Sequence, residues 1–133
     1  MELIHQRTSE KILRGFYNVY NNLGYGFSEK VYENALVMEL SGSGLICNKQ
    51  KQLKVHYNGQ VVGEYFADII VDDSVILELK SASALIPEHE AQLLNYLRAT
   101  EMELGFLLNF GERPQFKRLV FRNSRKFGLP QTI

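Results

Sequence analysis

The sequence has few of the features that mark secreted or membrane proteins. Cys47 is the only cysteine in 133 residues, so no disulfide can form within the chain. No stretch approaches the roughly 18 consecutive apolar residues that mark a membrane-spanning helix. The first ten residues carry charges instead of the apolar run of a secretory signal. We therefore expect a protein of a reducing compartment, the cytoplasm, with no membrane partner.

An excess of charge of one sign is also lacking. The 15 Lys and Arg residues offset the 15 Asp and Glu residues, giving a formal net charge of +0. Such a chain is not expected to coat nucleic acid through bulk electrostatics. The C-terminal part is nevertheless basic, because no acidic residue follows Glu112. It is either a solvated tail, basic over about 122–133, or a phosphate-binding surface. The nucleic-acid-binding candidates are Arg113, Lys117, Arg118 and Arg122.

The length and the apolar content favour a single domain over residues 1–133. Hydrophobic residues make up 45% of the chain, the ordinary fraction for a globular protein. The sequence contains no internal repeat, no low-complexity linker, and neither a G-x-G-x-x-G nor a Walker phosphate-binding pattern.

Hydrophobic periodicity predicts two helices before the first strand. The first helix is capped by Thr8 or Ser9 and ends near Gly24, and the second is capped by Ser28. Each has one apolar stripe at helical spacing. The stripes are Ile12, Phe16, Val19, Tyr20 and Leu23 in the first helix, and Val31, Tyr32, Ala35, Leu36 and Leu40 in the second.

The pattern then changes to strands. Residues 50–80 predict a three-stranded antiparallel meander, with a tight turn at Asn58-Gly59 and a second turn at residues 72–74. A helix over about 88–99 and strands over about 104–110 and 116–121 follow. The run 104–110 is almost wholly apolar and suits a buried strand, parallel to a neighbour. This order predicts an α/β fold with a mixed central sheet flanked by about three helices.

The turn at residues 72–74 allows the strand pairing to be worked out. If the turn is centred on Asp73, Asp68 lies directly opposite Glu78. Because side chains alternate between faces, Asp68, Glu78 and Lys80 then share one face with Phe66, Ile70 and Ile76. The other face is expected to pack on a helix-covered core, and it carries Tyr65, Ala67, Ile69, Val71, Val75, Leu77 and Leu79.

Two opposed carboxylates among apolar residues indicate a metal site. They repel each other and are partly desolvated, and a bound cation relieves both costs. Carboxylate oxygens suit Mg²⁺ or Mn²⁺, and Lys80 can point at the same substrate atom. Such a site is suited to cutting phosphodiesters. The plainer interpretation is a surface hairpin whose acidic and basic side chains form a weak ion-pair cluster.

Asp68 followed by Glu78-Leu79-Lys80 resembles the PD-(D/E)XK nuclease superfamily, although Ala67 stands where the family's name has Pro. Three further segments resemble the small bacterial GxxExxY proteins within that superfamily. They are residues 26–32 (GFSEKVY), 89–97 (HEAQLLNYL) and 105–111 (GFLLNFG). The resemblance covers about residues 9 to 121 and implies a restriction-endonuclease-like core.

The resemblance also implies roles for individual residues. Asp68, Glu78, Glu29 and the Leu79 carbonyl would hold the Mg²⁺ or Mn²⁺ ion, and Lys80 would orient the attacking water and offset charge in the transition state. Gln92 matches a position that often lines such sites. Both helper residues have simpler explanations as well. A carboxylate in a first helical turn, as at Glu29, is favoured by the helix dipole, and Gln92 can be an ordinary polar helix residue.

These features predict a metal-dependent nuclease whose expected substrate is DNA, with RNA as the alternative substrate. Sequence specificity would come from a homodimer or from a protein partner. The alternative is a catalytically silent nuclease-like module that binds nucleic acid or assembles with protein, because fold similarity does not establish activity. Convergence of Glu29, Asp68, Glu78 and Lys80 would favour the enzyme, and Lys80 held in a buried salt bridge would favour the module. An unrelated α/β domain would require the Asp68–Glu78 register to be wrong.

Overall fold

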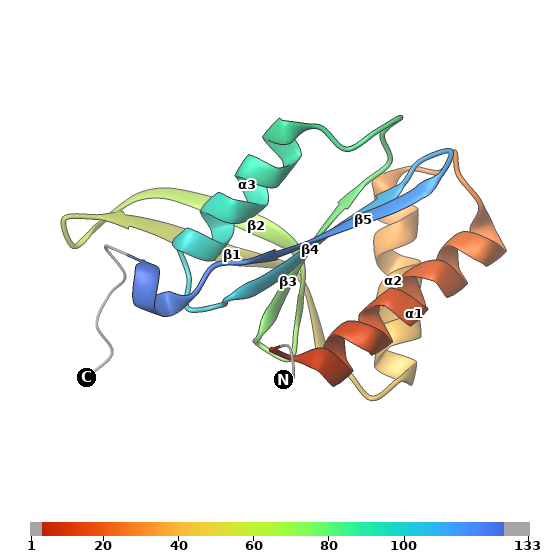
Figure 1. Ribbon diagram of the computed structural model, residues 1–133, viewed down its shortest axis with the longest axis horizontal. Helices are drawn as coiled ribbons and strands as arrows, with labels where there is room; N and C mark the ends of the chain where they lie inside the picture. Colours follow the sequence, from red (N-terminus) through yellow and green to blue (C-terminus); the bar gives the residue numbers. More distant parts are fainter. Residues whose placement is uncertain (1–3, 127–133) are drawn as a thin grey trace.

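The computed structural model describes residues 4–126, which form a five-stranded sheet with helices on both of its faces (Figure 1). The strands lie in chain order across the sheet; β3 and β4 are parallel and every other neighbouring pair is antiparallel. The elements are α1 (Gln6–Leu23), α2 (Glu29–Gly42), β1 (Cys47–Tyr57), β2 (Gln60–Val71), β3 (Val75–Lys80), α3 (Pro87–Arg98), β4 (Leu104–Phe110), β5 (Pro114–Val120) and the 3₁₀ helix η1 (Asn123–Arg125).

Helices α1 and α2 lie together on one side of the sheet, and α3, the crossover between the parallel strands, lies on the other (Figure 1). Each side has its own apolar core. The core beneath α1 and α2 includes Ile12, Phe16, Leu36, Ile69, Leu77 and Phe106. The core beneath α3 includes Leu53, Ala67, Ile70, Ile76, Leu93 and Leu107. No helix within residues 4–126 is long and apolar enough to cross a membrane.

The structure confirms the predicted α/β class, the mixed sheet and the hairpin register. Ile69, Ile70 and Val71 pair with Leu77, Ile76 and Val75, which is the register derived from the turn. Asn58 and Gly59 both have positive φ, 49° and 77°, as the predicted tight turn requires. Every residue of β4 is buried, and the strand runs parallel to β3.

Several predicted boundaries were wrong. Helix α1 begins at Gln6, so Thr8 and Ser9 both lie inside the helix and cannot cap it; Ser9 is also buried. Ser28 does precede α2, but its side chain makes no capping hydrogen bond. Strand β1 begins at Cys47, three residues before the predicted meander. The sequence gives no sign of this start, because residues 47–52 do not alternate between apolar and polar side chains.

The predicted division of β2 between two faces was also partly wrong. Ala67 packs in the α3 core, and the Tyr65 ring lies 5.5 Å from the ring of Tyr96 on α3. Strand alternation breaks where Gln50 adopts a positive φ of 52°, and the Gln50–Asp68 pair is missing from the otherwise continuous β1–β2 ladder. The side chains on either side of this point therefore alternate in opposite phase. On β2 the change of phase falls at Asp68.

One polar side chain of β4 fixes the chain just beyond the end of β3. Asn109 is fully buried; its Oδ1 accepts the Ala82 N–H at 2.9 Å, and its Nδ2 donates to the Ala82 carbonyl at 3.0 Å. Gly111 packs against the same residue. Only glycine fits there, because a Cβ atom would collide with the Ala82 carbonyl oxygen. These contacts hold the segment that follows Lys80 against β4.

Candidate metal centre

Asp68 and Glu78 come together where the β2–β3 ladder stops. The last pair of that ladder is Ile69 with Leu77. Beyond this pair, carboxylate oxygens replace backbone carbonyl oxygens as the acceptors for the strand N–H groups. Glu78 Oε1 accepts the Asp68 N–H at 3.1 Å, and Asp68 Oδ2 accepts the Leu79 N–H at 2.8 Å. The two acidic side chains therefore lie close together on the sheet. Each is held by a hydrogen bond from a backbone N–H of the opposite strand.

The environment of Glu78 disfavours its charge. Its side chain is 4% exposed, and burial, followed by the neighbouring charge of Asp68, raises the pKa of Glu78 from 4.5 to about 8. The Asp68 N–H and the Lys80 ammonium act in the opposite direction but do not offset the burial. A carboxylate in this position gains from any nearby cation, because the cation removes the repulsion and replaces lost hydration.

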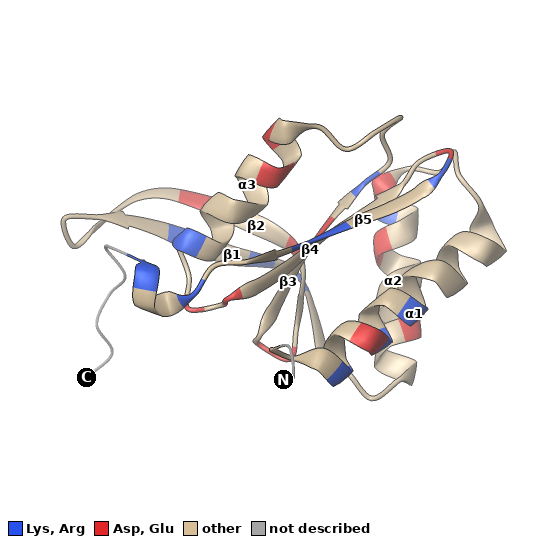
Figure 2. Ribbon diagram, viewed as in Figure 1, with Lys and Arg blue, Asp and Glu red and all other residues tan. Residues whose placement is uncertain are grey.

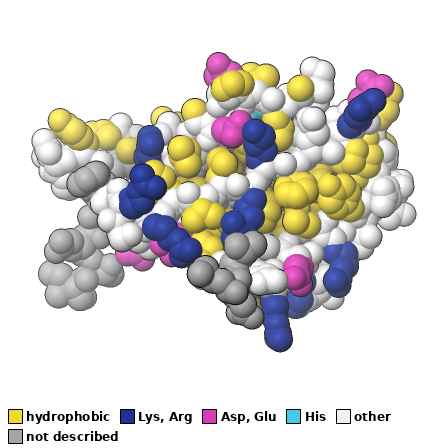
Figure 3. Space-filling model, viewed as in Figure 1, with side chains coloured by type: hydrophobic (Ala, Val, Ile, Leu, Met, Phe, Trp, Pro, Cys, Tyr) yellow, Lys and Arg dark blue, Asp and Glu magenta, His cyan; other side chains and the backbone are white. Residues whose placement is uncertain are grey.

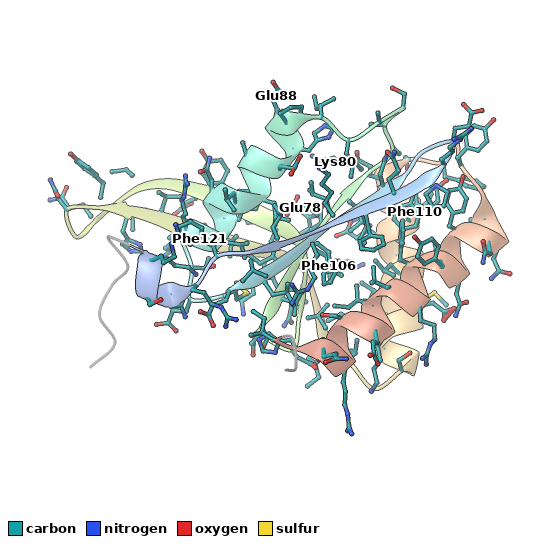
Figure 4. The ribbon with its side chains drawn as sticks, in the orientation of Figure 1. Glu78, Lys80, Glu88, Phe106, Phe110 and Phe121 are labelled. Carbon is teal, nitrogen blue, oxygen red and sulfur yellow. The ribbon has the colours of Figure 1, made fainter. Side chains whose placement is uncertain are left out.

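Lys80 follows Glu78 by two residues on β3 and so lies on the same face. Its ammonium points toward the α3 side (Figure 4). Its Nζ donates to Gln92 Oε1 at 3.2 Å. Within residues 4–126, Lys80 takes part in none of the salt bridges, so its charge is available to a ligand. The structure thus brings four predicted residues to one place: Asp68, Glu78, Lys80 and Gln92.

Helix α2 contributes an acidic residue to this place, and it is Glu33 rather than Glu29. Glu29 is exposed in the first turn of α2. Glu33, one turn later, is 4% exposed. The Gln50 amide nitrogen lies 3.0 Å from Glu33 Oε1 and 3.4 Å from Asp68 Oδ1, so it bridges the two carboxylates.

Glu33 is not among the predicted site residues, although its position in the sequence carries a signal. Glu33, Leu36 and Leu40 recur at helical spacing, and all three are buried. A charged residue on the buried stripe of a helix is rarely left without a partner. Besides Gln50, Glu33 has an ion pair with Lys30 at 3.4 Å.

The donor set fits a hard divalent cation that keeps part of its water shell. Mg²⁺ is commonly held by one or two carboxylates together with waters and substrate phosphate, and Asp68 and Glu78 supply such a pair. Leu79 has its side chain in the α1–α2 core and its N–H on Asp68. Among residues 4–126 no three His, Cys, Asp or Glu side chains form a ready-made cage. A cation here would therefore depend on water or substrate for its remaining ligands.

The basic candidates of the C-terminal half do not form one continuous surface. Lys117 and Arg118 are neighbours on β5 and point to opposite faces of the sheet. Lys117 pairs with Glu90 of α3 at 3.1 Å, whereas Arg118 donates to the Ile4 carbonyl at 3.3 Å. Arg113 and Arg122 are exposed at opposite ends of β5. Residues 127–133 of the predicted basic tail lie outside the described residues.

The residues of the GFSEKVY segment have a clear structural use. Tyr32 is fully buried and stacks on Phe110 of β4, with ring centroids 4.3 Å apart. Its hydroxyl donates to the Gly24 carbonyl at 2.6 Å and accepts the Phe27 N–H at 3.3 Å. Tyr32 therefore fixes the α1–α2 connection and the start of α2, the helix that carries Glu33.

The fold and this cluster define a nuclease-like α/β domain with two paired carboxylates and a lysine at the end of a hairpin. The family model of the PD-(D/E)XK nuclease superfamily matches residues 6–119, and the chain belongs to that superfamily. Members of the superfamily generally use divalent metal ions. No curated protein matches the chain at a significant level.

One solved structure, the crystal structure of SSO0001, shares the fold. Its TM-score is 0.59 at 21% sequence identity, over 70% of this chain and 50% of the other. The chain thus spans about half the length of the structure it matches. The likeness supports the restriction-endonuclease-like architecture derived above.

Proposed function

We propose that this protein is a metal-dependent nuclease that hydrolyses phosphodiester bonds. DNA is the first candidate substrate and RNA is the second. The observation that carries the proposal is the approach of Asp68 to the buried Glu78. Their like charges repel, and neither carboxylate forms a salt bridge within residues 4–126. Membership of the PD-(D/E)XK superfamily supports it. We also place the chain among the GxxExxY proteins, on the strength of the segments that contain Glu29, Gln92 and Asn109.

The cofactor in this proposal is Mg²⁺ or Mn²⁺, held by Asp68, Glu78 and the Leu79 carbonyl. When bound, such an ion polarises the scissile phosphate and lowers the pKa of a coordinated water. Glu33 would act on the site through Gln50, which holds Asp68 in place. Glu29 would act only through water, because its side chain is exposed at the start of α2.

Lys80 supplies the positive charge that this reaction needs. The ammonium donates to Gln92 and forms no salt bridge among the described residues. It would stabilise the charge that develops on the phosphate oxygens and orient the attacking water, and its effect is largest where bulk water is excluded. Gln92 is a positioning residue in this scheme.

The test is a cleavage assay on single- and double-stranded DNA and RNA with Mg²⁺ or Mn²⁺. We expect Asp68→Asn and Lys80→Ala to abolish cutting. Asp73→Asn is the matched control for Asp68→Asn, since Asp73 is in the turn of the same hairpin and is exposed at a positive φ that Asn tolerates. Cutting that survives in both site variants would refute this assignment.

A second function is favoured by the protonation of Glu78. Burial raises the pKa of Glu78 to about 8, so at neutral pH its carboxyl group keeps its proton, which a metal ion would have to displace. A catalytically silent module that binds nucleic acid, or that assembles with a protein partner or a second copy, would need no metal ion. Wild-type protein that binds nucleic acid but cuts none of the four substrates, with either ion present, would establish the module instead.

A further inference from the structure

A groove follows α3 on the side that faces the β1–β2 hairpin, and it lies next to the candidate metal centre. Its volume is about 600 Å³, within the range of ~300–1,000 Å³ that is usual for ligand sites. The hairpin contributes Val55, His56 and Tyr65, and α3 contributes Gln92, Asn95 and Tyr96. In Figure 1 the hairpin extends away from the body of the molecule beside α3.

The groove is continuous with the cluster around Glu78. Gln92 lines the groove and also accepts the hydrogen bond of Lys80. Tyr96 lines it one helical turn later and faces the same carboxylates; burial and then the charges of Glu78 and Asp68 raise the pKa of Tyr96. A ligand that lies in the groove therefore comes close to the metal centre where Gln92 and Tyr96 line the groove.

The lining suits a nucleobase. The rings of Tyr65 and Tyr96 lie 5.5 Å apart with a 46° tilt. Tyr65 is 49% exposed and Tyr96 is 6% exposed, so Tyr65 offers the open ring face. His56 adds a third ring, and its Nδ1 is buried without a hydrogen-bond partner. Asn95 and Gln92 add amides that can pair with a base edge. Aromatic faces with nearby hydrogen-bonding groups are how proteins bind unpaired bases, whose faces and edges a duplex conceals.

The charges of the groove differ between its ends. Glu88 lines it at the start of α3, and Arg98 lines it at the end, about 15 Å away at the helical rise. Arg98 and Arg125 both lie over the Phe121 ring, 5.2 Å and 5.9 Å from its centroid. Figures 2 and 3 show Lys and Arg gathered around this end of α3 and η1. Phosphates are therefore favoured at the Arg98 end.

We propose that the groove binds single-stranded nucleic acid, with an unpaired base between α3 and the hairpin and the backbone leading to Arg98. The protein would then act on single strands or frayed ends in preference to intact duplex. This inference rests on the proposed function for what happens at Asp68 and Glu78. Binding itself can be measured without it.

The test measures binding to full-length protein in EDTA, so that no cleavage occurs. Fluorescence anisotropy is followed with labelled oligothymidylate, oligouridylate and a hairpin duplex. Ala91→Phe places a ring in the groove from an exposed helix position, and we expect it to weaken single-strand binding roughly tenfold or more, the loss expected when one base stack is blocked. Asn21→Phe, exposed on α1 across the sheet, is the matched control and should bind as wild type does.

Arg98→Ala provides a second variant at the surface. It should weaken binding and lower the salt dependence by roughly one phosphate contact, whereas Arg14→Ala on α1 should change neither. Comparing the affinities for oligothymidylate and oligouridylate shows whether the groove binds DNA or RNA more tightly. Tighter binding of duplex than of single strands, or wild-type affinity in both Ala91→Phe and Arg98→Ala, would overturn the proposal.

The cleavage assay separates the two proposals. Wild-type protein that binds single strands in the groove but cuts nothing with Mn²⁺ would sustain the groove and refute hydrolysis. Ala91→Phe protein that cuts single strands at the wild-type rate would refute the groove and sustain hydrolysis.

Discussion

Replacing Glu78 with Gln should stabilise the protein at neutral and alkaline pH. The Glu78 side chain is buried beside Asp68, and its pKa is raised from 4.5 to about 8. The unfolded chain releases this proton near pH 4.5, but the folded chain keeps it until about pH 8. Between these values the folded state holds more protons, so stability falls as the pH rises. Gln resembles the protonated acid and cannot titrate.

The size of the effect follows from the two pKa values. At about 1.36 kcal/mol for each pH unit, the interval from 4.5 to about 8 corresponds to an upper limit of ~5 kcal/mol. The wild-type stabilisation from protonated Glu78 is fully present below pH 4.5 and is lost by about pH 8. Glu78→Gln should therefore match the wild type at low pH and exceed it by up to that limit at high pH.

Urea unfolding in EDTA, from about pH 5 to about pH 9, measures this difference. Subtracting the variant's free energy of unfolding from that of the wild type isolates residue 78, because the other groups titrate in both proteins. Glu112→Gln, an exposed carboxylate, is the control and should follow the wild type at every pH. Parallel curves for wild type and Glu78→Gln would refute the reasoning, since they would show that Glu78 carries its charge without cost.

The remaining predictions concern the same cluster. Mn²⁺ should raise the Tm of the wild type more at pH 8 than at pH 6, because the ion must displace the Glu78 proton, and Asp68→Asn should lose this shift in a thermal melt. Glu33→Gln should lower the rate of DNA cleavage more than Glu29→Gln, because only Glu33 shares Gln50 with Asp68; the opposite order would return the role to Glu29. Asn109→Leu should cost ~2–3 kcal/mol in urea unfolding, because it leaves the partly buried N–H and C=O groups of Ala82 without their hydrogen-bond partner.

Local chemistry accounts for the parts of the fold that the sequence predicted well. The turns at Asn58-Gly59 and at residues 72–74 use residues that tolerate positive φ, and each fixes the register of its hairpin. Once the register was known, strand alternation was enough to bring Asp68, Glu78 and Lys80 together. The parallel partner of β3 followed from a run of apolar residues that only a strand covered on both faces can bury.

The errors share a physical origin in tertiary context. Gln has no preference for left-handed backbone, so the break at Gln50 leaves no mark in the sequence. That break places Ala67 beneath α3, contrary to alternation. Helical spacing marks Glu33 as buried but does not show what it contacts, because its partner Gln50 comes from β1 and is 17 positions away in the chain.

Asn109 has a consequence for any attempt to move this site to another scaffold. The hairpin holds the two acids and the lysine, so it looks like a transferable unit. Yet the chain immediately after Lys80 is anchored by a side chain of β4, a strand that supplies no candidate ligand. A hairpin transplanted alone would leave its lysine end unanchored, so the smallest portable version of this site includes residues 104–111.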